Sequence, residues 1–232
     1  MKFANFYILL IALVIISCSK TENNSLEFIE QTTGRYLYNS DEVVEVYFKE
    51  NDLLMKWRGA NNIIPLKLKD NTFFVKEMNE KIQFLMNPTN DILYLSLIPK
   101  GESKTITYNF KKLNSDEKIP SDYLKINQFD KALAGYLNIQ KIDSLDGSIN
   151  ESNFNSLGYS KLRKDDFKTA LDIFKINVAL YPNSSNVYDS LADAYKKSGD
   201  TIQAISNYKK SLALDSGNKR AKRNIDRLEK KN

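Results

Sequence analysis

Two consecutive segments decide the fold of the second half of the chain: SNFNSLGYSKLRKDDFKTALDIFKINVALYPNSS at residues 152–185 and NVYDSLADAYKKSGDTIQAISNYKKSLALDS at residues 186–216. When the chain is compared with itself at a shift of 34 residues, apolar residues, small residues and polar breaks coincide. The coinciding pairs include Leu157 with Leu191, Gly158 with Ala192, Ala170 with Ala204, Phe174 with Tyr208 and Leu180 with Leu214. A period of this length is typical of stacked helical hairpins.

Small residues at fixed positions explain why such hairpins would pack. Gly158 lets the first helix of a pair approach the second closely at Ala170, and Phe174 fills the gap to the next pair. We expect Pro182 to end the second helix of the first pair, because proline cannot continue a helix. Ser216 and the glycine that follows it would end the second pair.

The pattern over residues 152–216 resembles the tetratricopeptide repeat, with Lys161 where the second copy has Tyr195 and Ser216 where the first has Pro182. The resemblance implies two helical hairpins, and residues 218–229 would form a terminal helix that covers the last apolar face. Residues 152–232 are therefore expected to hold two tetratricopeptide repeats plus a capping helix. Ala132, Leu133 and Tyr136 repeat the spacing of the second helix, so residues 114–151 are expected to be a linker and a degenerate leading hairpin.

The resemblance also implies a partner-binding surface lined by the first helix of each pair, with the terminal helix alongside. Ten residues are placed there: Asn155, Tyr159, Arg163, Asn186, Asp189, Asp193, Lys196, Arg220, Arg223 and Arg227. The three arginines recur at i, i+3 and i+7 and share one stripe, which could bind the carboxylate of a peptide C-terminus or an acidic segment. The alternative is a solvated basic end that faces a helix C-terminus.

Residues 31–113 have a different period. Apolar residues alternate with polar ones, as in Val44–Phe48, Ile64–Leu68, Leu93–Leu97 and Ile106–Phe110, and turn clusters separate these runs. About eight short strands at this spacing predict a small antiparallel β-barrel or sandwich. Its aromatic residues would form the core or line a ligand cavity: Trp57, Phe73, Phe74 and Phe84. The whole chain is thus expected to be α+β with two domains.

A second resemblance covers the β-region. Gly34-Arg35-Tyr36, Ile64-Pro65-Leu66 and Asn71-Thr72-Phe73-Phe74, in this order, look like the small β-domain behind the catalytic domain of penicillin-binding-protein-like serine hydrolases. Residues 152–157, 174–182 and 186–191 resemble repeats that trail some of these hydrolases. The catalytic domain is missing, and the Ser-x-x-Lys matches lie at unsuitable places, so no catalytic residue is expected. The resemblance implies an accessory tail that exists as an independent lipoprotein.

The N-terminal residues predict export. Lys2 precedes a nearly continuous apolar run of fourteen residues, Phe3–Ile16, which is shorter than the roughly 20 residues that span a bilayer. Residues 1–17 are therefore expected to be a signal peptide. Ile15-Ile16-Ser17-Cys18 resembles a bacterial lipobox, which implies lipidation of Cys18 and leaves residues 18–30 as a tether. The alternative is an uncleaved anchor. Either predicts attachment to a bacterial membrane in the cell envelope, most simply the outer membrane.

Composition excludes several kinds of chemistry. The chain of 232 residues has no histidine and one cysteine, which removes histidine-dependent triads, imidazole zinc sites and internal disulfides. The net charge of +5 belongs to residues 217–232, which carry seven lysines or arginines against two acids. No general acid or base can be identified, so we expect no catalysis, no cofactor and no metal.

These observations predict a non-enzymatic, lipid-anchored scaffold or adaptor that binds a protein or peptide through its repeats. One alternative is an accessory subunit of a separate serine hydrolase or peptidase acting on cell-wall or peptide substrates. Another is a β-domain that carries a small apolar ligand. Nucleic acid is an unsuitable partner for an exported chain.

Overall fold

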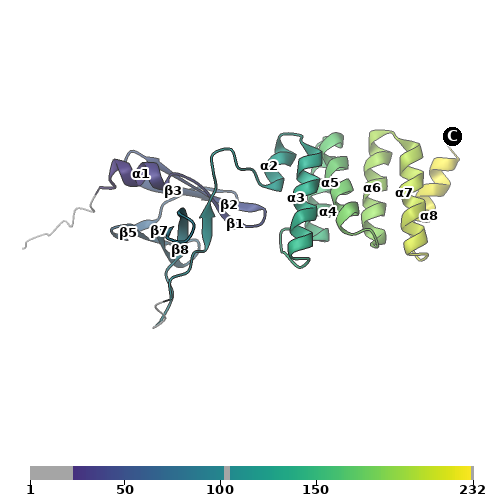
Figure 1. Ribbon diagram of the computed structural model, residues 1–232. Coiled ribbons are helices and arrows are strands. Elements are labelled where there is room, and N and C mark those ends of the chain that lie inside the picture. The colour runs from purple at the N-terminus through teal and green to yellow at the C-terminus, as the bar shows by residue number, and fades with distance from the viewer. Residues whose placement is uncertain (1–22, 102–104, 231–232) are drawn as a thin grey trace, which may run out of the picture.

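The protein is described by a computed structural model of residues 23–101 and 105–230. The fold is α+β: in the described residues, one helix precedes nine strands and seven helices follow them (Figure 1). The expected signal peptide and the expected lipidation site Cys18 lie outside the described residues.

The strands form one antiparallel sheet in the order β4-β3-β2-β1-β9-β8-β7-β6-β5. Pairing of β1 with β9 joins its two halves, since Tyr36 lies opposite Lys112. The edge strands β4 and β5 follow each other in the chain but do not pair within the described residues, so the sheet is curled and is not a closed hydrogen-bonded barrel. Its strands are β1 Gly34–Asn39, β2 Glu42–Lys49, β3 Asp52–Trp57, β4 Ala60–Ile63, β5 Leu66–Lys69, β6 Thr72–Val75, β7 Glu80–Asn87, β8 Ile92–Leu97 and β9 Phe110–Lys112.

Helix α1, Leu26–Thr32, packs against the sheet core through Phe28. It begins within the expected tether, residues 18–30, and continues beyond it. The Ser25 side chain caps it by accepting a hydrogen bond from the backbone N–H of Phe28. The ring of Phe28 lies 5.6 Å from that of Phe84 and 6.1 Å from that of Phe73, measured between centroids. Phe28 therefore occupies the interior where an apolar ligand of the β-domain was considered.

The other aromatic residues considered for a ligand cavity are distributed unequally. Phe73 and Phe84 are buried in the core, while Phe74 and Trp57 are half-buried. The indole of Trp57 packs against Tyr38, with ring centroids 5.1 Å apart, and the Arg58 guanidinium lies 4.6 Å from its centroid. Trp57 thus sits at the margin of the sheet core.

Two predicted strands differ from the observed ones. The run Ile106–Phe110 is extended only from Phe110, because the Asn109 side chain accepts the backbone N–H of Leu97 at 2.8 Å and replaces a ladder bond. In β5 the leucines face outward: Leu66 is 62% exposed and Leu68 is 44% exposed. An alternating pattern does not say which face meets the core, and at this edge strand the expectation of a half-buried leucine face was wrong.

The helical region begins with a short hairpin, α2 Pro120–Lys125 and α3 Phe129–Ile142. Two longer hairpins and a final helix follow: α4 Glu151–Leu162, α5 Phe167–Leu180, α6 Ser185–Ser198, α7 Thr201–Leu214 and α8 Lys219–Glu229. Figure 1 shows them side by side in a row that leads away from the sheet. A Cβ atom added to Gly158 would lie 2.6 Å from the Phe174 ring, so the glycine is required by close approach to this ring.

The turn between β1 and β2 connects the sheet to the helices. The Asp41 carboxylate accepts hydrogen bonds from the Ser121 backbone N–H at 2.7 Å and from the Tyr136 hydroxyl at 2.6 Å. Arg35 of β1 forms an ion pair with Asp122 of α2.

Burial raises the pKa of Asp41. By contrast, although burial favours the neutral form of Asp122, the Arg35 and Lys125 hydrogen bonds together hold its pKa below its ordinary value.

Candidate functional site

The helices α4, α6 and α8 form one continuous surface, which we name the first-helix face. The Tyr159 hydroxyl of α4 donates a hydrogen bond to Asp193 of α6 at 2.9 Å, and Arg220 of α8 donates to the same carboxylate at 2.6 Å. The N-terminus of α8 is set by Asn218, whose side chain accepts the backbone N–H groups of Arg220 and Ala221. Three segments separated in sequence are therefore held together by polar contacts.

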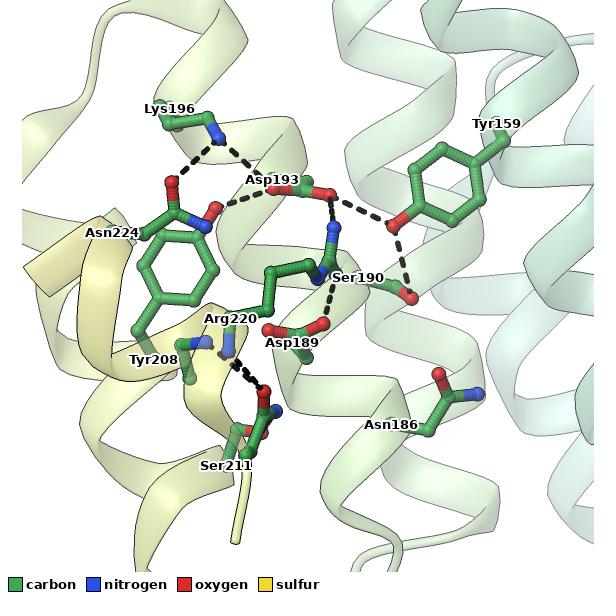
Figure 2. A network of polar contacts seen from close by, with 12 residues as sticks. Tyr159, Asn186, Asp189, Ser190, Asp193, Lys196, Tyr208, Ser211, Arg220 and Asn224 are labelled. Carbon is green, nitrogen blue, oxygen red and sulfur yellow. Dashed lines mark hydrogen bonds and ion pairs between the residues drawn. The ribbon is translucent and has the colours of Figure 1, made fainter.

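Asp193 is the centre of this network (Figure 2). Its second oxygen accepts hydrogen bonds from the Lys196 ammonium at 3.2 Å and from the buried Tyr208 hydroxyl. Burial, followed by the hydrogen bond to Asp193, raises the pKa of Tyr208, and burial raises that of Tyr159. Both phenols therefore remain protonated and act as donors to the carboxylate.

Asp189 lies one helical turn before Asp193 and also pairs with Arg220. The side chain of Asp189 is 7% exposed, whereas that of Arg220 is 45% exposed. The other oxygen, Oδ1, is buried and has no hydrogen-bond partner among the residues that the structure describes. Arg220 and Lys196 together balance the charges of Asp189 and Asp193, as buried carboxylates require.

An open recess of about 360 Å³ lies beside this network on α4. Its lining is polar and comprises Ser152, Asn155, Ser156, Tyr159 and Arg163. The side-chain oxygen of Asn155 is buried there without a hydrogen-bond partner in the described part of the chain. The recess therefore offers hydroxyl groups and one guanidinium to a polar ligand.

A second recess, of about 370 Å³, lies between the short hairpin and α4–α5. Helix α2 has only six residues, while α4 has twelve, so the first hairpin leaves part of the α4 surface uncovered. Most of the lining surface is apolar and includes Leu124, Phe154, Leu157 and Ile173. Asp41, Lys125 and Lys161 lie at its polar margins. This recess is a consequence of the degenerate leading hairpin.

The structure brings some of the ten predicted residues together and leaves others apart. Asp189, Asp193, Lys196, Arg220 and Tyr159 form the network, and Asn155 and Arg163 line the adjacent recess. The Asn186 amide instead donates to Glu151 of α4 at 2.9 Å.

The arginine stripe of α8 is divided in the structure. Arg220 is engaged by two carboxylates, whereas Arg223 and Arg227 are exposed and form no side-chain hydrogen bond or ion pair with the rest of the described chain. The idea that all three arginines are available to one ligand does not fit this geometry.

Several members of the network were not predicted. Ser190 contacts the Tyr159 hydroxyl at 3.3 Å, and Asn224 accepts from Lys196 at 3.2 Å. Tyr208 aligns with Phe174 of the first repeat, and this alignment predicts packing only. The difference between the two side chains could have predicted a polar contact, because a buried phenol normally has a hydrogen-bond partner.

Within residues 23–101 and 105–230, no group of three or more carboxylate, thiol or imidazole side chains is arranged to hold a metal ion. The longest helices in the same residues have 14 residues, and none combines the length and apolarity needed to cross a membrane.

Comparison with known proteins gives partial similarities. No known family model matches the chain. A segment of 70 residues is 40% identical to Heat shock protein STI1 of Saccharomyces cerevisiae, which covers 30% of this chain and 12% of that protein. The chain thus spans a small part of the relative that it matches.

Three solved structures each match 48% of the chain. The first TPR of Spaghetti (RPAP3) bound to an HSP90 peptide has 18% sequence identity, with 85% of that chain covered and a TM-score of 0.35. MamA has 20% sequence identity, with 63% of that chain covered and a TM-score of 0.35. The Arabidopsis OM64 TPR domain has 20% sequence identity, with 88% of that chain covered and a TM-score of 0.34. These TM-scores do not by themselves establish a shared fold. The helical region has the architecture that its 34-residue period predicts: two stacked hairpins, α4–α5 and α6–α7, followed by α8.

Proposed function

We propose that the protein is a non-enzymatic, lipid-anchored scaffold that binds a protein or peptide on its first-helix face. The observation that carries this proposal is the network around Asp193, which holds α4, α6 and α8 in one surface. A preorganised polar surface loses little conformational entropy on binding. The recess at Asn155 provides a place for a polar side chain of the partner.

The charge of the exposed groups favours an acidic partner. Asp189 and Asp193 are already neutralised internally by Arg220 and Lys196. Three exposed guanidinium groups lie outside this network, Arg163 at the end of α4 and Arg223 and Arg227 on α8, and guanidinium groups bind carboxylates with two hydrogen bonds. We therefore propose that an acidic segment or a C-terminal carboxylate lies across α4 and α8.

A cross-linking experiment tests whether the partner binds on the first-helix face. A photoreactive amino acid at Ser156, which is exposed in the α4 recess, should cross-link a partner in cells, while the same group at the exposed Lys175 on α5 should not. The double variant Arg163→Glu with Arg223→Glu should abolish the cross-link at an unchanged melting temperature. The matched control is Lys175→Glu, which should leave it intact. Equal cross-linking at both positions would contradict the proposal.

The identity of the cross-linked chain also separates this function from the alternative. Recovery of a serine hydrolase or peptidase would make the protein its accessory subunit, as the β-domain resemblance implies. Recovery of an unrelated protein would favour a general adaptor.

The anchor needs a separate test. Cys18→Ala should leave an uncleaved precursor and prevent incorporation of a clickable fatty acid. Persistent label on the variant would contradict lipidation at this residue.

A further inference from the structure

Four large apolar side chains are exposed on α1, immediately before β5 and on β5. Figure 1 draws α1 and β5 at the end of the β-domain farthest from α8. Leu26 at the start of α1 is 79% exposed, Ile64 before β5 is 68% exposed, and Leu66 and Leu68 on β5 are 62% and 44% exposed. We name these four residues the apolar edge. Single exposed leucines are common, but a group at one end of a domain indicates a contact surface.

The chain enters the fold at this edge. Asn24 is fixed by its backbone N–H, which donates to the Asn51 side chain at 2.6 Å, and by its amide, which donates to the Asn51 carbonyl at 2.7 Å. The Lys67 ammonium of β5 donates to the Asn24 side-chain oxygen at 3.0 Å. Ile64 and Leu66 line the same recess as Asn24. The residues that precede Asn24 therefore start beside the exposed leucines.

Chain length limits how far the edge can be from an anchor at Cys18. Six residues lead from Cys18 to Asn24. A fully extended chain rises at most about 3.5 Å per residue, so this segment spans no more than about 21 Å. A lipidated Cys18 would therefore keep the apolar edge within about that distance of the bilayer surface.

We propose that the apolar edge inserts into the headgroup region of the membrane to which the protein is anchored. This inference rests on the proposed anchoring at Cys18. Leu66 and Leu68 are both exposed on β5, so both can enter the lipid, and Leu26 and Ile64 extend the contact. The repeat array then points away from the lipid, with its first-helix face at the distal end of the molecule.

The contact is apolar in character. Lysines and acidic residues balance each other in β5 and the neighbouring turns: Lys49, Lys67 and Lys69 against Glu50, Asp52 and Asp70. Binding should therefore respond little to salt or to anionic lipid. Lys67 and Lys69 on the edge strand also disfavour strand pairing with a second copy, which is why lipid is the proposed occupant.

Depth-dependent fluorescence quenching on the full chain tests the proposal. Once Cys18 is acylated, the chain holds no free thiol, so Leu66→Cys or Leu68→Cys can be labelled with the environment-sensitive dye NBD. In phosphatidylcholine vesicles with doxyl-labelled lipid, NBD at either position should be quenched at least twofold more than NBD at Ile202→Cys. Ile202 is the matched control, because it is 76% exposed and lies on α7.

A second variant tests insertion without relying on one probe position. With NBD at Leu26→Cys, the added pair Leu66→Ser and Leu68→Ser should reduce lipid quenching to the level of the Ile202 control. Both leucines are exposed, so the β-domain should keep its melting temperature. Acylation at Cys18 should also be unchanged.

The outcomes separate the two proposals. Acylated protein whose probes at 66 and 68 are quenched no more than the probe at 202 overturns the inference and leaves the anchor standing. Dye attached to Cys18 itself shows that no acyl group is present, which removes both. Energy transfer between labelled copies without lipid quenching identifies the edge as an interface between two copies of the chain and overturns the lipid assignment.

Discussion

The β-domain and the repeat array bury their cores in different ways. The sheet has one cluster of buried residues that joins strands from both halves of the domain, and Phe28 of α1 packs against it. The helical region has three clusters, each shared by neighbouring helices. A single core makes a domain cooperative, whereas a row of local cores allows parts to open separately. Equal losses of packing should therefore spread differently in the two regions.

The largest expected effect on stability comes from replacing a buried phenylalanine in each region. Phe84→Ala in the sheet and Phe174→Ala in the array should each lower the free energy of unfolding by about 3 to 5 kcal/mol, because each removes a buried ring. Hydrogen exchange should rise across all strands in the first variant and mainly in α4, α5 and α6 in the second. If both variants lost protection against hydrogen exchange equally throughout the chain, the proposed difference between a single core and a row of local cores would be wrong.

The next effect concerns the charge network that joins the local cores. Asp193→Ala leaves the buried Tyr208 phenol without its acceptor and removes one acceptor each from Arg220, Lys196 and Tyr159, so it should cost about 3 kcal/mol by chemical denaturation. The matched control is Asp172→Ala, which breaks only the exposed Lys168 pair at 3.5 Å and should cost less than about 1 kcal/mol. A cost for Asp193→Ala as small as that of the control would mean that the network does not couple α6 to α8.

A smaller effect comes from the junction between the regions. Burial raises the pKa of Asp41 above its ordinary 3.8, so the folded protein binds this proton more tightly than the unfolded chain does. The stability contributed at Asp41 is therefore greatest below the ordinary pKa and falls as the pH rises through the raised value. Asp41→Asn removes this titration.

The difference in unfolding free energy, wild type minus Asp41→Asn, should decrease between pH 4 and pH 7. Using the difference cancels the opposite trend of Asp122, whose lowered pKa stabilises the fold more as the pH rises. A difference that is flat or grows with pH contradicts the assignment.

The smallest expected effect comes from Gly199, the glycine that ends α6 in the repeat array. Gly199 ends α6 with a φ of 90°, a left-handed conformation that costs about 1 kcal/mol for alanine. Gly199→Ala should therefore lower the free energy of unfolding by about that amount. Gly147→Ala, where an added Cβ meets nothing within 4 Å, should change it by less than about 0.5 kcal/mol. Similar melting temperatures for both variants would show that the cap is dispensable.

The sequence predicted the helical region better than the curled sheet. The spacing of Gly158, Ala170 and Phe174 depends on contacts between adjacent helices, so it can be read directly from a 34-residue period. The outward leucines of β5 could not be predicted, because a period of two leaves the choice of face to distant partners. Asn24, whose contact with Lys67 accompanies that choice, lies 43 positions earlier in the chain.

The candidate site was predicted in its location and only partly in its contacts. The resemblance put Asp189, Asp193 and Arg220 on one face, and the structure brings them together. It did not predict that they pair with one another, since ion pairing depends on side-chain geometry rather than on helical spacing. The consequence for binding is that fewer arginines remain open than the stripe suggested.

The position of Trp57 provides an optical separation of the two regions. It is the one tryptophan of the chain and lies at the margin of the sheet core against Tyr38 and Arg58. Its emission should therefore follow unfolding of the β-domain, while circular dichroism at 222 nm follows mainly the helices. A denaturation curve recorded with both signals on the unmodified protein would directly show whether the sheet and the array melt together.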